Sequence, residues 1–153
     1  MYKVIVKYPK NEEELEILKK MGNINTNLEL EPVVKSTQII SARKIVDQIY
    51  IAENIQKYIV SLVLSTREPA KYNLNDLESL ISFGASPRAT IFLSTAAKSH
   101  AFIKKRAYVI PEDVRAVGKA ILRHRIILTY EAEAEEITTE EIIQRIYESV
   151  PTP

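Results

Sequence analysis

The scarcity of glycine is the feature that most constrains this chain of 153 residues. Its three glycines are Gly22, Gly84 and Gly118, about a quarter of ordinary usage. A G-x-x-x-x-G-K-[ST] loop, which cradles nucleotide phosphates, needs two glycines five residues apart, and a G-x-G-x-x-G loop needs three close together. These positions fit neither pattern. The chain therefore cannot form either glycine-rich nucleotide-binding loop by itself.

Further function classes are excluded by what the composition lacks. The chain has no cysteine, which excludes thiol nucleophiles, disulfides and cysteine-ligated metal sites. Its two histidines, His100 and His124, are far apart in the sequence, so we expect no transition-metal site. No apolar run approaches 18 residues and no signal-peptide pattern opens the chain, so we expect a soluble, cytoplasmic protein with no membrane partner.

Charge is unevenly distributed along the chain, although the net charge is only +1. Residues 77–125 carry nine Lys and Arg against three Asp and Glu, whereas residues 126–153 carry one against seven. Two interpretations stay open. Either the basic segment faces an anion such as nucleic acid or a nucleotide phosphate, or the acidic C-terminal segment folds back on it.

The first 40 residues predict one strand, one helix and an irregular stretch. Alternating Val and Ile predict a strand over 2–8. A lone strand is not a stable unit, so this one needs partner strands from elsewhere. A helix follows from its expected cap, Asn11, to about Met21, where Gly22 ends it. Residues 23–38 are polar and irregular in pattern.

From residue 41 onward the pattern is helical. Ser41 is the expected cap of a helix over 42–50. The next helix presents one apolar face and ends near Thr66; this face comprises Ile55, Tyr58, Ile59, Leu62 and Val63. Residues 70–84 are predicted as a loop with a short helix around 74–81. The helix over 87–105 is rich in Ala and Ser, so we expect it at the centre of a bundle.

The last third contains a weak internal repeat. Residues 108–114 and 136–142 each combine a short apolar stretch, an acidic first turn and a helix. Pro111 suits the first helical position, and Thr138 with its partner Glu141 forms a capping box. We expect the two short stretches to pair as a ribbon. Residues 125–130 are predicted to be buried, as an extended or a helical segment.

The sequence Ser86-Pro87-Arg88 is the best candidate for a functional site. Ser86 is a natural N-cap and Pro87 a natural first helical residue. Arg88 then lies in the first turn, where a cation opposes the helix dipole at a cost of roughly 0.3–1 kcal/mol. An anion bound there would explain the arginine, because the free N–H groups of a helix start attract phosphate. The alternative is an arginine that reaches solvent or a nearby carboxylate.

Several segments together resemble the MoxR family of AAA+ ATPases. The sequence Gly84-Ala85-Ser86-Pro87-Arg88-Ala89 resembles the family's G-A-S-P-R-A segment. Four further segments resemble family motifs in the same order: 3–9 with the glutamates at 12–14, 65–67, 108–114 and 122–126. The resemblance spans almost the whole chain.

This resemblance implies a mainly α fold, a helical-bundle AAA+ lid domain with minor short β segments. Residues 1–22 would be the last strand and helix of the ATPase core, 23–40 a linker and 41–153 the helical lid. The Walker A, Walker B and arginine-finger elements of the family would lie upstream, so this chain alone would not hydrolyse ATP.

The resemblance also implies roles for the site residues. Arg88 corresponds to the family's sensor-two arginine, which reaches the γ-phosphate of ATP, held with Mg²⁺ by the core. Ser86 and Pro87 would fix the turn that aims Arg88. From its position before a proline-containing loop, and not from the resemblance, Arg67 is expected to pin that loop or to approach the nucleotide.

Family members imply partners as well. They form ring-shaped hexamers, act in chaperone-like maturation of protein complexes, and often work beside a protein with a von Willebrand factor A domain. The upstream core is the first partner of this chain. Two competing interpretations are a basic helical nucleic-acid-binding module, which the scattered tyrosines do not favour, and a protein-interaction domain without a nucleotide role.

Two departures from the family pattern affect local stability. Ile110 stands where the family has a small hydroxyl residue before the proline, so that helix loses a side-chain cap. Arg43 and Lys44 stand where the family tends to be acidic. Elsewhere, His124 is expected at the core edge, hydrogen-bonded to backbone, and 104–106 as a solvated basic helix end.

Overall fold

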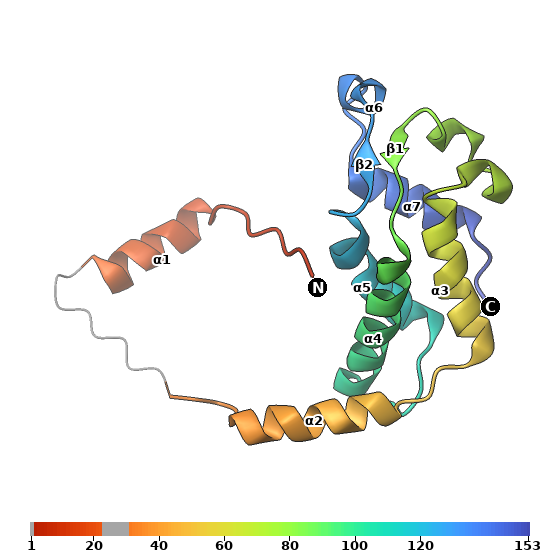
Figure 1. Cartoon of the computed structure of the whole chain (residues 1–153). Coiled ribbons are helices and arrows are strands. Elements are labelled where there is room, and N and C mark those ends of the chain that lie inside the picture. Colours follow the sequence, from red (N-terminus) through yellow and green to blue (C-terminus); the bar gives the residue numbers. More distant parts are fainter. Residues whose placement is uncertain (1, 23–30) are drawn as a thin grey trace.

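A computed structural model of the chain describes residues 2–22 and 31–153, and most of them are helical (Figure 1). The elements are α1 Asn11–Met21, α2 Ser36–Gln48, α3 Glu53–Ser65, the short 3₁₀ helices η1 Pro69–Tyr72 and η2 Asn75–Leu77, β1 Ile81–Phe83, α4 Pro87–Ile103, α5 Pro111–Leu122, β2 Ile127–Leu128, α6 Tyr130–Ala134 and α7 Thr139–Ser149. The predicted mainly α class is confirmed.

Helix α4 lies at the centre of the bundle, as its small residues predict. It packs against α5, α3 and α2. Its buried positions are mostly alanine: Ala89, Ala96, Ala97 and Ala101. Because alanine adds little bulk beyond the backbone, the neighbouring helices approach α4 closely.

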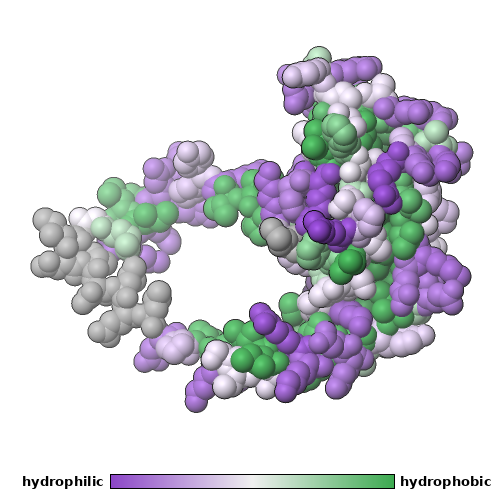
Figure 2. Space-filling model, viewed as in Figure 1, coloured by the Kyte–Doolittle hydropathy of each residue, from purple (hydrophilic) through white to green (hydrophobic). Residues whose placement is uncertain are grey.

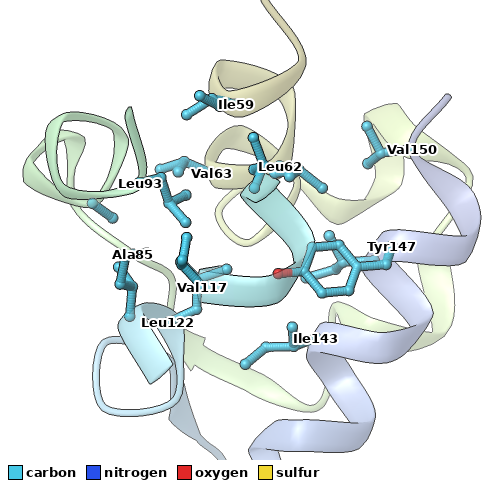
Figure 3. Close-up of a cluster of buried hydrophobic side chains, with 14 of the residues drawn as sticks. Ile59, Leu62, Val63, Ala85, Leu93, Val117, Leu122, Ile143, Tyr147 and Val150 are labelled. Carbon is cyan, nitrogen blue, oxygen red and sulfur yellow. The ribbon is translucent and has the colours of Figure 1, made fainter. Parts of the chain in front are cut away.

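The core is completed by one face each of α3, α5 and α7 (Figure 3). The predicted face of α3 is confirmed, and all five of its residues are buried. Helix α7 contributes Ile142, Ile143, Ile146 and Tyr147. Burial of such side chains, at about 25 cal/mol per Å² of apolar surface, provides the main force that holds the helices together.

Two predicted helix starts are confirmed. Pro111 is the first residue of α5. At α7, Thr138 Oγ1 accepts the N–H of Glu141 at 3.3 Å, and a Glu141 carboxylate oxygen accepts the N–H of Thr138 at 2.7 Å. Ile110 provides no side-chain cap, as expected, but a carboxylate oxygen of Asp113 accepts the Ile110 N–H at 2.9 Å, which is the reciprocal half of a capping box.

Two other predicted caps are wrong. Lys10, not Asn11, is the N-cap of α1, and its N–H donates to Glu13 at 2.8 Å. Helix α2 begins at Ser36, and Ser41 lies inside it with its hydroxyl bonded to the carbonyl of Thr37. Serine can bond back to the i−4 carbonyl within a helix, so its presence alone does not mark a start. The predicted linker over 23–40 therefore has a helical C-terminal end; residues 23–30 lie outside the described part.

The predicted two-stranded ribbon between the repeat segments, 108–114 and 136–142, is not formed. Instead, β1 pairs antiparallel with β2, with Ile81 opposite Leu128. Tyr108 forms an isolated parallel bridge with Tyr50. Strands of two or three residues are too short to carry a pairing pattern in their sequence, which explains the error. Residues 127–128 are extended, one of the two predicted states. The predicted burial of 125–130 is wrong for most of the segment, because Ile126 is buried but Ile127 and Tyr130 are exposed. Helix α6 is not predicted by the sequence.

Helix α1 lies away from the bundle, whereas the chain before it returns to the bundle at Lys3 (Figure 1). Residues 2–9 do not form the predicted strand, because a strand needs a partner backbone and this one makes a single bond to the bundle, from the Lys3 N–H to the Ala120 carbonyl at 2.8 Å. Val4 and Val6 are 74% and 89% exposed, and α1 buries none of its residues. Figure 2 shows exposed apolar surface on this part of the molecule and on α2.

Within the described ranges, none of the helices has the length and apolar character needed to cross a bilayer.

Candidate functional site

The turn that starts α4 is anchored by the end of α3. Thr66, which is 1% exposed, follows the last residue of α3. Its hydroxyl donates to the Val63 carbonyl at 2.7 Å and accepts the backbone N–H of Ala85 at 2.8 Å. The methyl group of Ala85 is fully buried in the core (Figure 3). The turn is thus fixed by a buried hydrogen bond and by packing.

Gly84 allows this close approach. A Cβ at position 84 would lie 2.2 Å from the carbonyl oxygen of Thr66 and 2.7 Å from Cγ of Arg67. A backbone oxygen at that distance cannot move aside without shifting the chain. The glycine of the G-A-S-P-R-A segment is therefore required by packing against the end of α3.

Ser86 and Pro87 occupy their predicted positions. Ser86 is the N-cap of α4, with extended backbone, and Pro87 is the first helical residue. The Ser86 hydroxyl makes no capping hydrogen bond, whereas its carbonyl accepts the Ala89 N–H at 2.8 Å. The contribution of Ser86 to this start therefore comes from its backbone. Pro87 adds a fixed φ that suits a first helical residue.

Arg88 lies in the first turn of α4 and is exposed. That turn contains no acidic residue, unlike the first turns of α1, α5 and α7. Across residues 2–22 and 31–153, its side chain forms no hydrogen bond or ion pair. Of the two predicted environments, the structure therefore shows the solvent-facing one rather than a nearby carboxylate.

Arg67 lies beside the turn rather than with Arg88. It lines a cavity of about 360 Å³ together with Thr66, Glu68, Pro69, Ala70, Lys71, Glu78, Ile81, Ser82 and Gly84. Arg88 does not line this cavity. The stem of Arg67 covers Gly84, which fits a residue that pins the loop. Its approach to a nucleotide stays a prediction.

A buried charge cluster joins the loop after α4 to α5, and sequence reasoning missed it. Asp113 is fully buried. Its carboxylate accepts two hydrogen bonds from Arg106, one of them 2.7 Å long, and contacts Nδ1 of His100 at 2.6 Å. Arg106 is thus engaged with a carboxylate and is not part of a solvated helix end as predicted, whereas Lys104 and Lys105 are exposed.

The cluster sets the ionisation of Asp113. Burial alone would raise the pKa of this carboxyl, but hydrogen bonds from Arg106, from the Ile110 N–H and from His100 outweigh burial and lower the pKa to about 2. Asp113 is therefore a structural anion that holds α5 to the end of α4. The sequence signal was an acidic residue three positions after an apolar cap.

His124 differs from its prediction as well. It is exposed, and Nε2 contacts a guanidinium nitrogen of Arg125 at 2.7 Å instead of a backbone group. Desolvation, the Arg125 charge and the Lys3 charge together lower the pKa of His124. In the part of the chain that the structure describes, no three or more His, Asp or Glu side chains are placed to hold a metal ion.

Among the described residues, the predicted contact between the acidic C-terminal segment and the basic segment is present in one ion pair. Glu140 lies 3.0 Å from Nε of Arg123. If the basic segment faces an anion instead, the arginines available to bind that anion are those without a carboxylate partner among the described residues.

Comparison with known proteins identifies the family. The AAA lid domain family matches residues 75–146. Chaperone MoxR1 of Mycobacterium tuberculosis is 37% identical over all 153 residues, which cover 40% of its length. Protein MoxR of Methylorubrum extorquens is 35% identical over 105 residues, or 65% of this chain and 30% of that protein. This chain belongs to the MoxR family of AAA+ proteins.

The fold of the whole chain is shared with a solved structure. A crystal structure of a proposed ATPase from Cytophaga hutchinsonii matches with a TM-score of 0.91 and 42% identity, and covers 100% of this chain and 46% of that one. This MoxR-family chain spans less than half the length of these relatives. Its lid match, residues 75–146, includes the turn that carries Arg88.

Proposed function

We propose that this chain is the lid segment of a MoxR-like ATPase and that Arg88 is its sensor-two arginine. The ATPase core, with its Walker motifs, ATP and Mg²⁺, would be supplied by sequence outside these 153 residues. Residues 2–8 would then join the sheet of that core as its last strand, which accounts for the exposed valines at positions 4 and 6.

One observation carries this proposal. The turn before Arg88 is fixed by the buried Thr66–Ala85 hydrogen bond, while the Arg88 side chain itself is exposed and without an acidic partner among the described residues. A rigid backbone that presents an uncompensated cation suits a side chain that binds an anion on another surface.

The donor set of this site fits a phosphate group. The guanidinium of Arg88 can donate two parallel hydrogen bonds to phosphate oxygens. It lies at the start of a 17-residue helix, where the helix dipole also favours negative charge. The core would supply phosphoryl-transfer chemistry, and Arg88 would stabilise charge on the transferring phosphate.

The same contact would couple the nucleotide to movement. When Arg88 loses its phosphate partner, the lid is released from one of its contacts with the core and can rotate. In a ring of six such subunits, this rotation would serve chaperone-like maturation of protein complexes, in line with the name of the relative MoxR1. A protein with a von Willebrand factor A domain is the proposed partner.

The coupling can be tested with fluorescent labels, one on the core and one at an exposed lid position, in a protein that joins this chain to its core. We expect the distance to differ between ATP-bound and ADP-bound states in the wild type, and to stay constant in Arg88→Ala. A distance change of equal size in both proteins would contradict the proposal. Arg43→Ala, which removes an exposed arginine from α2, is the matched control.

A further inference from the structure

A second arginine lies next to the face of α4 that carries Arg88. Arg88 and Phe92 are four residues apart on α4, so their side chains are neighbours on one face of the helix. The guanidinium carbon of Arg125, from the loop after α5, lies over the ring of Phe92 at 5.0 Å from its centroid. Arg88 is therefore on the same helix face as the ring that Arg125 covers.

Arg125 is held in this position by several contacts. Its Nη1 donates to the carbonyl of Ile121, in the last turn of α5, and contacts Nε2 of His124 at 2.7 Å. The residue is half-buried. Together with the cation–π contact to Phe92, these contacts fix the direction of the guanidinium without neutralising it.

Two other arginines near α4 and α5 are paired with carboxylates: Arg106 binds Asp113 and Arg123 binds Glu140. Arg115, like Arg125, has neutral acceptors, the Tyr147 carbonyl and the hydroxyl of Thr152. Within residues 2–22 and 31–153, neither Arg88 nor Arg125 forms an ion pair with a carboxylate.

The surroundings of Arg125 add further positive charge. Burial lowers the pKa of the Arg125 guanidinium, and burial, followed by the charges of Arg125 and Lys3, lowers the pKa of His124. Partial burial of a cation beside like charges is unfavourable unless an anion relieves it. The geometry and the charge thus both favour an anion at this place.

We infer that Arg125 and Arg88 together bind one phosphate group, the terminal phosphate of a nucleotide. The inference rests on the proposed function and extends it: Arg88 would supply the exposed donor, and Arg125, fixed on Phe92, a second donor whose direction is set in advance. Because both arginines belong to one small region around Phe92, they suit a compact, highly charged anion better than the extended backbone of a nucleic acid.

The 153-residue chain allows a direct test with tripolyphosphate, which carries the charge of the nucleotide's phosphates without its base. Proton–nitrogen NMR spectra of arginine side chains report each Nε–H separately. We expect the Nε–H signals of Arg88 and Arg125 to shift together at low salt, and the shifts to shrink between about 50 mM and about 200 mM salt. The signal of Arg43, on α2, is the internal control.

Variants make the test quantitative. Arg125→Gln and Arg88→Gln should each weaken tripolyphosphate binding by about 5- to 20-fold, whereas Arg43→Gln should leave it unchanged. Arg125→Lys keeps the charge and should recover part of the loss. Because Arg125→Gln also removes the contact with Phe92, thermal unfolding of each variant checks that it still folds. The wild-type titration tests the inference whether or not a variant folds.

Each remaining outcome decides against the inference. A shift of Arg88 alone, or unchanged affinity in a folded Arg125→Gln, would overturn the paired site and leave the role of Arg88 intact. Absence of any shift at low salt would overturn it too, while ATP turnover in the core-containing protein would still judge the proposed function separately. Tighter binding of a short DNA duplex than of tripolyphosphate would replace the nucleotide with nucleic acid.

Discussion

The hydroxyl of Thr66 lies 2.8 Å from the backbone nitrogen of Ala85 and accepts its hydrogen bond in the interior of the bundle. This contact connects the end of α3 with the turn that starts α4. It ties the direction of the first turn of α4, and of Arg88 on it, to the packing of the whole lid rather than to a local loop.

Thr66→Val should therefore destabilise the chain. Valine keeps the shape but leaves the buried N–H of Ala85 without an acceptor, at a cost of about 1–3 kcal/mol. Urea unfolding followed by circular dichroism measures the loss. Thr95→Val is the matched control, because Thr95 is exposed and bonds only to the Ile91 carbonyl of its own helix. Equal effects of both changes would contradict the importance of the buried contact.

Gly84→Ala should also destabilise the chain. The added Cβ would lie 2.2 Å from the Thr66 carbonyl oxygen, so the turn must move away from α3, at a cost of about 1–3 kcal/mol. The same unfolding assay checks this, and the spectrum of the Arg88 side chain should change as the turn shifts. A variant as stable as the wild type, with an unchanged Arg88 signal, would show that the contact tolerates a side chain.

How much of this site the sequence can predict depends on the range of the interactions. The positions of Ser86, Pro87 and Arg88 follow from local rules for helix starts, and the structure places them accordingly. The contact between Thr66 and Ala85 spans 19 residues, and no local pattern indicates it. Family resemblance supplied the role of Arg88, which the residues alone left open between anion and solvent.

The fold, too, is predictable where interactions are local and unpredictable where they are long-range. The buried face of α3 and the central place of α4 follow from periodicity and small residues, because these are properties of one helix. The pairing of β1 with β2 was not predicted, since so few residues carry no register signal. The predicted start of α2 is too late in the sequence, because Ser41 is a residue type typical of caps but lies inside the helix.

The Asp113 cluster predicts a loss of stability in acid. The pKa of this carboxyl is about 2 in the folded chain against 3.8 for an ordinary Asp. A lowered pKa stabilises the fold above the unfolded value and loses this contribution as pH falls through the folded value. The free energy of unfolding of the wild type, relative to Asp113→Asn, should therefore decline by about 2 kcal/mol between about pH 4 and about pH 2.

Asp76→Asn provides the control for this titration. Asp76 is an exposed carboxylate that pairs with Arg145 on the surface, where ion pairs contribute little. Its removal should leave the acid dependence of the wild type unchanged. If Asp113→Asn retained the full acid dependence as well, the stabilising role of the buried carboxylate would be wrong.

Gly118 and Tyr147 form a second tight contact. The Tyr147 hydroxyl is buried without a hydrogen-bond partner in the described chain, and burial raises its pKa. A Cβ at position 118 would lie 1.7 Å from this oxygen and 3.0 Å from the ring carbon that bears it. Alanine usually stabilises a helix relative to glycine, but here Gly118→Ala should destabilise by about 1–3 kcal/mol.

A double-mutant cycle separates the two effects. Tyr147→Phe should be neutral or slightly stabilising, because it removes an unsatisfied polar atom. In that background, Gly118→Ala should cost less than in the wild type, since the oxygen that it meets is absent. Additive costs in unfolding experiments would mean that the two residues do not meet as the structure shows.

ATP turnover by the proposed full-length protein, which joins this chain to an ATPase core, tests the central claim most directly. Arg88→Ala should lower turnover by roughly 100-fold or more, as expected for loss of a group that stabilises transferring phosphate. The exposed Arg43→Ala should have no effect, and unfolding curves of both variants should match the wild type. Turnover at the wild-type rate in a folded, assembled Arg88→Ala protein would contradict the assignment of Arg88.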